Sequence, residues 1–297
     1  MTSYLHHIRA CNTHDLSDFR PFRVGGDQVG WVRHALADHL TRFDDVFDVG
    51  QDGISLRETL GTFDSRSEAM ARVLDALVAD GTIQRLRREA YPVVTAWGAE
   101  PLLKIDRSAV AFFGIRSFGL HINGFVRRPD GLHLWVGKRA TDRRIAPGKL
   151  DNLVAGGQPY GLSLDENLVK EAEEEAGLSA DAARRAMPVG AVSYLMENEA
   201  GLKPDTLFLY DLELAEDFTP RNTDGEVEEF MLWPLDQVAA RVRDTDDFKF
   251  NVNLVIIDFL VRHGYLKPEQ PDYLDLVMGL RRPLWGSSRF TEIPPWP

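Results

Sequence analysis

The N-terminal part of the chain combines helical and extended patterns of hydrophobic residues. Residues 65–81 place apolar side chains three and four positions apart and stop at Gly81, which predicts a helix whose buried stripe is Ala69, Val73, Leu74 and Leu77. The spacing in residues 29–43 also indicates a helix, and residues 91–97 are typical of a strand. We therefore expect residues 1–117 to form a small α/β domain.

The pattern changes at about residue 118, where extended segments become frequent. A hairpin turn, Pro129-Asp130-Gly131, lies between the first two of the strands predicted at 118–128, 132–140, 191–198, 206–214 and 228–235. Helices are predicted over 234–244 and 252–264. We expect residues 118–297 to form an α/β domain with helices flanking a mixed sheet, and the tail from 281 to wrap the surface.

Composition narrows the class of protein. At 297 residues the chain exceeds the usual size of one core, which favours two domains. The formal net charge of −12 argues against a nucleic-acid groove, which needs a basic face. A single cysteine, Cys11, fits a reducing cytoplasm. With no evident export signal and no apolar run of ~18 residues, we expect a cytoplasmic protein without a membrane partner.

The most informative stretch is GGQPYGLSLDENLVKEAEEEAGL, residues 156–178. Ser163 followed by Glu166 is typical of a capping box and Gly177 of a helix stop, which together predict a helix over about 164–176. At ~100° per residue, Glu173 points to the far side of this helix. Three other carboxylates share an arc of about 100°, namely Glu171, Glu174 and Glu175.

Two interpretations of this acidic helix stay open from its residues alone. In the first, the helix has a solvated acidic face, with Lys170 pairing Glu166 or Glu174. In the second, the shared edge binds a divalent cation. Such a cation would offset both the repulsion between like charges and their unfavourable position near the helix C-terminus.

The glycine pair, loop, capped helix and closing Gly-Leu together resemble the Nudix hydrolase signature. The matching positions are Gly156, Glu171, Glu174, Glu175, Gly177 and Leu178. The resemblance implies an α/β/α sandwich with a mixed sheet. It also implies that Mg²⁺ or Mn²⁺ is bound by the three carboxylates and by a carbonyl of the turn at Gly156 or Gly157. Two positions depart from the signature: Leu162 stands where a first glutamate is expected, and Lys170 replaces an arginine.

A wider resemblance is to a Nudix subfamily with an extra N-terminal domain, related to the Nudix part of fungal thiamine pyrophosphokinase fusions. It is carried by FFGIRSFGLHINGFV, KRATDRRIAPGKLDNLVAGGQPYG and DGEVEEFMLWPL. The resemblance implies a metal-dependent hydrolase that releases a monophosphate from a small organic diphosphate, thiamine diphosphate or its oxidised analogues. The N-terminal domain itself carries no chemical motif. Three roles stay open for it: a wall of the substrate pocket, the interface of a homodimer, or the cover of an exposed sheet.

A diphosphate substrate needs cations beyond the metal ions. One segment of this acidic chain supplies five of them: Lys138, Arg139, Arg143, Arg144 and Lys149. Guanidinium groups suit phosphate oxygens, so Arg139 and Arg144 are the favoured contacts, with Arg143 and Lys149 as further substrate-binding candidates. For each of them the alternative is an exposed basic side chain that balances neighbouring acids.

A further acid is expected after the signature helix. The Nudix family often draws a base or metal ligand from a later loop, and TDGEVEEF offers Asp224, Glu226, Glu228 and Glu229. We favour Glu226 and Glu229. Upstream, His121 lies in an alternating strand and is interpreted as a structural, hydrogen-bonded imidazole.

The departures at Leu162 and Lys170 keep a second function open. A Nudix-like module could bind a nucleotide or thiamine phosphate as a sensor without turnover. A third hypothesis is an α/β interaction protein whose acidic helix is simply a solvated surface.

Overall fold

The computed structural model describes residues 3–284, and contacts divide the chain into two compact units. Among the described residues, the C-terminal unit comprises 3–12, 118–193 and 206–282, and the N-terminal unit comprises 13–117, 194–205 and 283–284. By these contacts, residues 3–12 group with the C-terminal unit and residues 194–205 with the N-terminal unit. The predicted surface-wrapping tail lies, after Leu284, outside the described residues.

The N-terminal unit contains a small mixed sheet with two helices. Its four-stranded sheet has the order β2-β1-β4-β3, with β1 antiparallel to β2 and parallel to β4, and a separate two-stranded sheet pairs β5 with β6. The bounds are Phe19–Val24 (β1), Asp27–Arg33 (β2), His34–Leu40 (α2), Phe47–Val49 (β3), Ile54–Leu56 (β4), Phe63–Ala79 (α3), Ala90–Val93 (β5) and Leu103–Asp106 (β6).

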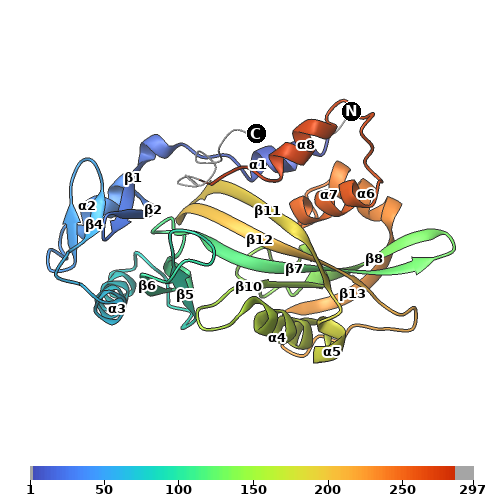
Figure 1. The fold of residues 1–297 in the computed structure, drawn as a ribbon, viewed down its shortest axis with the longest axis horizontal. Helices are drawn as coiled ribbons and strands as arrows, with labels where there is room; N and C mark the ends of the chain where they lie inside the picture. Colours follow the sequence, from blue (N-terminus) through green and yellow to red (C-terminus); the bar gives the residue numbers. More distant parts are fainter. Residues whose placement is uncertain (1–2, 285–297) are drawn as a thin grey trace, which may run out of the picture. The chain divides into compact units, whose positions relative to one another are not determined.

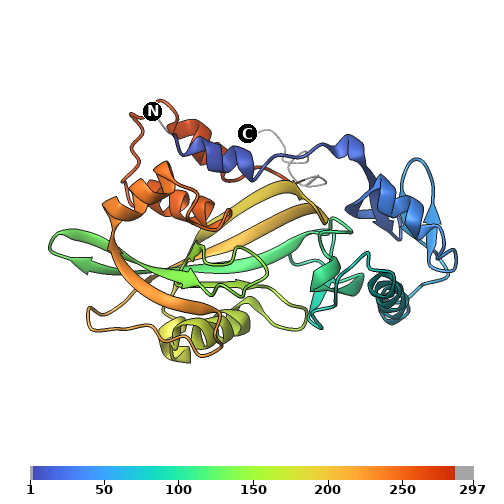
Figure 2. The ribbon, with the colours of Figure 1, turned by 180° about the vertical axis from the view of Figure 1, so that it is seen from behind.

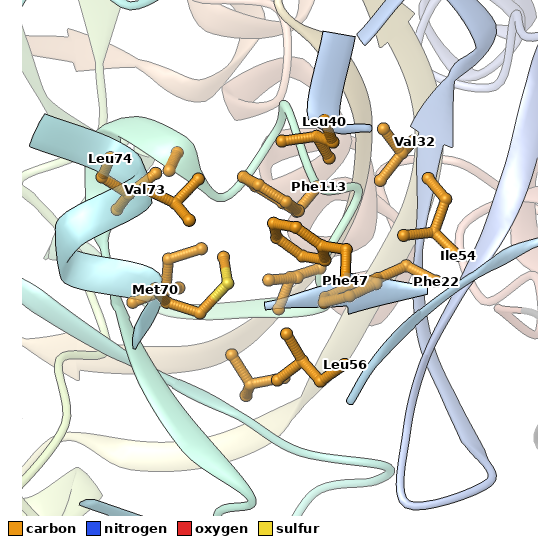
Figure 3. Packing of buried hydrophobic residues seen from close by; sticks show 14 of the residues in the cluster. Phe22, Val32, Leu40, Phe47, Ile54, Leu56, Met70, Val73, Leu74 and Phe113 are labelled. Atoms are coloured by element: carbon orange, nitrogen blue, oxygen red, sulfur yellow. The ribbon is translucent and has the colours of Figure 1, made fainter. Parts of the chain in front are cut away.

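The core of the N-terminal unit is apolar throughout. The ring of Phe22 lies 6.3 Å from that of Phe47 and 5.5 Å from that of Phe113, between ring centroids. Figure 3 shows Met70 and Val73 of α3 pointing into the same cluster. All four residues of the stripe predicted on this helix are buried, so that prediction is confirmed.

The prediction of one helix over residues 29–43 is wrong. Asp27–Arg33 form strand β2, and α2 begins only at His34. The valines of this run suit a strand paired along its length with β1. A Cβ atom at Gly30 would overlap the backbone carbonyl of Phe113. Tertiary contacts therefore override the helical spacing of the apolar residues.

The C-terminal unit is a sheet between two helical layers, as predicted. Its seven-stranded sheet has the order β11-β12-β7-β8-β13, with β10 paired to β7 and β9 to β8. Figures 1 and 2 show α4 and α5 on one face, and α6 and α7 on the other. The strands are Ser117–Arg128 (β7), Gly131–Arg139 (β8), Leu150–Asp151 (β9), Val154–Gly157 (β10), Met187–Asn198 (β11), Gly201–Glu213 (β12) and Val227–Pro234 (β13).

The helices of this unit are Leu5–Ala10 (α1), Leu164–Ala176 (α4), Ala180–Ala183 (α5), Leu235–Asp244 (α6), Val252–Arg262 (α7) and Tyr273–Gly279 (α8). The two predicted C-terminal helices are thus present as α6 and α7. The antiparallel pairing of β7 with β8 confirms the predicted hairpin. Within residues 3–284, no helix is both long and apolar enough to cross a membrane.

Candidate active site

Helix α4 begins and ends as the sequence predicts. The hydroxyl of Ser163 accepts from the backbone N–H of Glu166, and the Glu166 carboxylate accepts from the backbone N–H of Ser163 at 2.8 Å. Gly177 ends the helix in the left-handed conformation, at φ 65°. These caps fix the helix that carries the three glutamates of the signature.

Glu175 is the most deeply buried of these carboxylates, with 6% of its surface exposed. Its Oε2 accepts a 2.7 Å hydrogen bond from the backbone N–H of Ala155 on β10. Burial raises the pKa of Glu175 well above its ordinary value, and the negative charges of Glu171, Asp151 and Glu226 add to this rise while the Ala155 N–H opposes it. Carboxylates from three segments therefore interact electrostatically, and we call them the acidic cluster: Asp151, Glu171, Glu175 and Glu226.

Glu171 lies directly against the glycine turn. A Cβ atom at Gly156 would overlap the Glu171 carboxyl group, so glycine permits an approach that no other residue allows. The ammonium of Lys170 lies 3.1 Å from a carboxylate oxygen of Glu171 and 2.7 Å from one of Glu174. The predicted Lys170–Glu174 pair is therefore present and offsets repulsion between the two acids. Glu173 is exposed, as the helical geometry predicts.

The loop before α4 is fixed by side-chain amides. Gln158 donates from Nε2 to the carbonyl of Leu162 at 2.7 Å. Asn167, which is fully buried on α4, donates from Nδ2 to the carbonyl of Gly157 at 2.9 Å. These bonds tie the loop to itself and to the helix, so the turn is held without an acid at position 162.

The loop that precedes β13 is bound to the end of α4. The backbone N–H groups of Arg221 and Thr223 donate to the carbonyls of Ala176 and Glu174, both at 3.0 Å. This attachment holds Thr223, which follows Glu174 by 49 positions in the chain, at the end of the signature helix. Among the four acids considered in this loop, Glu226 is the one in the acidic cluster.

The other three acids of this loop are placed differently. Asp224 accepts from the backbone N–H of Glu226 at 2.8 Å and shapes the turn. Glu228 lies 3.1 Å from the ammonium of Lys138. Glu229, which we also favoured as catalytic, is exposed on β13 in register with Lys138, and among the described residues the structure does not bring it to the acidic cluster.

Arg139 is engaged in a buried ion pair instead of facing solvent. It donates from its Nη1 to Asp151 at 2.7 Å, and its other nitrogens donate to the carbonyl of Ile145. Both partners of the pair are 9% exposed or less. The expectation that Arg139 contacts phosphate therefore gives way to a positioning role, because without it Asp151 would be a buried charge lacking this partner.

The remaining cations of the basic segment lie nearer the surface. A nitrogen of Arg143 lies 2.6 Å from Glu226, which joins the basic segment to the acidic loop. Arg144 is exposed. Lys149 donates to the backbone carbonyl of Asp246 at 2.6 Å. That Arg143, Arg144 and Lys149 bind the substrate stays a prediction.

Lys249 is a site residue that the sequence analysis missed, because the segment around it matches no motif. Its ammonium lies 3.6 Å from Asp151, and its backbone N–H donates to the carbonyl of Leu150. Burial raises the pKa of Asp151, but Lys249, followed by His121, Arg139 and the backbone N–H of Asn152, outweighs burial and leaves this pKa below its ordinary value. Asp151 is therefore an anion that two cations position.

A buried polar chain continues from Asp151 into the core of the C-terminal unit. His121 donates from Nδ1 to the Oδ1 of Asn152 at 2.8 Å, Asn152 donates to Asn123 at 2.9 Å, and Asn123 donates to Asp211 at 3.0 Å. Burial, followed by the charge of Lys249, lowers the pKa of His121 to about 4. The predicted structural, hydrogen-bonded role of this histidine is confirmed.

The acidic cluster has the donor set that a hard divalent cation requires. The carboxylates of Glu171 and Glu226 both act electrostatically on Glu175, and the lack of a side chain at Gly156 leaves room for the Glu171 carboxyl group. Such oxygen ligands are those that Mg²⁺ prefers. Buried like charges repel one another, and a cation removes that penalty. Glu171 and Glu175 would hold such an ion, with Glu174 at the outer edge.

Comparisons with known proteins identify the family. A domain of unknown function, DUF4743, matches residues 3–117, and the NUDIX domain matches residues 118–252. Nudix hydrolase 20, chloroplastic, of Arabidopsis thaliana is 44% identical over 292 residues, covering 95% of this chain and 78% of the relative. Nudix hydrolase 24, chloroplastic, of the same plant is 44% identical over 285 residues, with the same two coverages.

An uncharacterized protein of Saccharomyces cerevisiae is similar over most of both chains. It is 30% identical over 302 residues, which cover 91% of this chain and 87% of the yeast protein. These relatives match across both units of the structure, so the likeness extends beyond the signature helix. The chain belongs to the Nudix hydrolases, a family of pyrophosphohydrolases.

Proposed function

We propose that this protein hydrolyses the diphosphate linkage of a small organic diphosphate in a reaction that depends on Mg²⁺ or Mn²⁺. The observation that carries the proposal is that the carboxylates of Glu171 and Glu226 act on the buried carboxylate of Glu175, while Glu171 lies against the glycine turn. A bound divalent cation supplies charge neutralisation of the phosphate oxygens and stabilises the charge that develops during transfer.

The side chains of this unit then have distinct tasks. Glu226 accepts a proton from the attacking water. As the new bond between this water oxygen and phosphorus forms, the bridging phosphorus–oxygen bond breaks. The two products are the organic monophosphate and inorganic phosphate. Arg143, which contacts Glu226, together with Arg144 and Lys149, binds the phosphate oxygens. Arg139 orients Asp151 and does not contact the substrate.

The substrate class that we propose is thiamine diphosphate or its oxidised analogues, with thiamine monophosphate and inorganic phosphate as products. Its support is the resemblance of both parts of the chain to the Nudix subfamily with an N-terminal accessory domain. We place the enzyme in a reducing compartment, in keeping with the single, buried Cys11. The sequence favours the cytoplasm, whereas the names of the two plant relatives refer to the chloroplast.

A screen of phosphate release tests this proposal. The panel should include thiamine diphosphate, its oxidised analogues, nucleotide sugars and dinucleotides, each with Mg²⁺ and with Mn²⁺. We expect turnover that requires the metal ion and is fastest with a thiamine compound. Tight binding without turnover would instead support the sensor hypothesis, for which the Lys170 ammonium between Glu171 and Glu174 is the favouring observation.

A pair of matched variants tests the assignment of the base. Glu226→Gln should lower kcat by about a hundredfold, since it removes a general base and keeps the shape of the side chain. Glu229→Gln changes an exposed acid in the adjoining strand and should have a much smaller effect. The reverse order would transfer the role to Glu229.

A further inference from the structure

A cavity of about 420 Å³ opens within the C-terminal unit, and Lys249 in its wall lies 3.6 Å from Asp151 of the acidic cluster. It lies between helix α1, the end of the basic segment and residues 246–253. Its wall is mostly apolar and includes Phe248 and Phe250. Ile145 adds a large apolar side chain that is 45% exposed. The cavity therefore suits a flat organic group better than a phosphate.

One polar side chain in this wall lacks a partner. Asn253, on the first turn of α7, is 1% exposed and lines the cavity. Its Oδ1 is buried and has no hydrogen-bond partner within residues 3–284. An unpaired buried amide destabilises a protein, so such a group is expected where a ligand completes its hydrogen bonds. By rotation of the amide, Asn253 can accept a hydrogen bond from a ligand or donate one to it.

Two lysines connect this cavity with the diphosphate site. Lys149 and Lys249 both line it, and Lys249 also lies 3.6 Å from Asp151 of the acidic cluster. A ligand with one end between the phenylalanines would thus direct its other, anionic end past two ammonium groups. The opposite wall is held in place by His7 of α1, which donates from Nε2 to the carbonyl of Val242 at 2.6 Å.

We propose that this cavity binds the organic end of the substrate, a planar nitrogen heterocycle that hydrogen-bonds to the Asn253 amide and packs against Phe248 and Phe250. The inference rests on the proposed function, because it makes the cavity the specificity pocket of the same diphosphatase. Helix α1, from the beginning of the chain, then forms one wall of that pocket. Specificity follows from the heterocycle, whereas the metal ions and arginines recognise the diphosphate that all substrates share.

The test compares two diphosphates that differ in the organic group. Thiamine diphosphate carries nitrogen heterocycles, and methyl diphosphate carries none. Asn253→Leu removes the amide at similar volume, and Ala10→Trp blocks the cavity from an exposed position on α1. For both variants we expect kcat/KM to fall at least about tenfold more for thiamine diphosphate than for methyl diphosphate.

The matched control is Asn251→Leu, which changes a buried asparagine two residues away that is not part of the cavity wall. It should leave the ratio of the two kcat/KM values unchanged. The melting temperature should not fall in Asn253→Leu, since the substitution removes an unpaired polar group. Equal losses on both substrates, or no loss on either, would overturn the proposed pocket while leaving the diphosphatase activity in place.

A binding measurement separates the pocket from the reaction. Saturation-transfer NMR with thiamine, without metal ion, should give signals from the ring protons in the wild-type protein and none in Ala10→Trp. If no diphosphate is hydrolysed but these signals behave as expected, the proposed function fails and the pocket stands. If the wild-type protein gives no thiamine signals, or if both variants retain them, the pocket assignment is wrong.

Discussion

The two units of this protein bury different kinds of side chain. In the N-terminal unit, the buried polar or charged side chains among the described residues are Ser67, Arg116 and Asp205. The C-terminal unit buries fourteen, including the His121–Asp211 chain and Glu175. Buried charges and amides destabilise a fold unless they are paired. Because most buried polar side chains lie in the C-terminal unit, we infer that this unit keeps side chains that lower its stability but serve the reaction. The N-terminal unit is stabilised mainly by apolar packing.

The largest expected effect that tests this contrast between the two units is on catalysis. Glu175→Gln should lower kcat by about a thousandfold, because it removes a buried carboxylate from the metal-binding set. Phosphate release with Mg²⁺ measures the loss, and a thermal melt verifies folding. Glu173→Gln is the matched control on the exposed side of the same helix and should retain activity. Equal activity of the two variants would remove the acidic cluster from the mechanism.

A core substitution examines the other unit. Phe22→Ala should lower the free energy of unfolding by about 3–5 kcal/mol, because the fully buried ring packs against Phe47 and Phe113. Urea denaturation followed by fluorescence gives the value. The kcat per folded molecule should stay unchanged well below the transition. A loss of kcat without a loss of stability would show that the N-terminal unit also takes part in the reaction.

The pH dependence of stability tests the buried histidine of the C-terminal unit. The pKa of His121 is about 4 in the fold, below the ordinary value of 6.5, so between these two values the unfolded chain binds more protons. Stability should therefore fall as the pH drops from about 6.5 to 4, by roughly 3 kcal/mol from this residue.

His121→Gln cannot take up this proton, so its stability should fall less over the same pH range. The difference between the two unfolding free energies, measured in urea at several pH values, isolates the contribution of the histidine. A difference that does not vary with pH would contradict the burial of a neutral imidazole.

The smallest expected effect comes from an exposed pair. Lys170→Met removes the contact with Glu174 on the surface of α4 and should lower the free energy of unfolding by no more than about 0.5 kcal/mol, since solvent screens such pairs. Chemical denaturation at two salt concentrations checks this value. A loss above about 1 kcal/mol would mean that surface charges support this unit more than the comparison implies.

Much of the active unit could be predicted from local sequence. The capping residues Ser163 and Gly177 act within a few residues of the helix ends, so their signals are fully present in the sequence. The partners of Arg139 and Glu226 are set by strand pairing and by a distant loop, and the sequence therefore left them open. The role proposed for Asn253 could not be predicted, because the sequence does not show that its Oδ1 is buried without a hydrogen-bond partner among the described residues.

The attachment of Arg221 and Thr223 to the end of α4 affects how well this enzyme tolerates insertions in the preceding loop. Because the helix end fixes the loop after this point, the position of Glu226 is largely independent of the chain that leads to it from β12. Doubling the length of a flexible loop costs only about 0.6 kcal/mol of closure free energy. Insertions at the exposed residues 215–217 should therefore be accepted with little loss of activity, which makes this part of the loop a suitable place for tags or grafted segments.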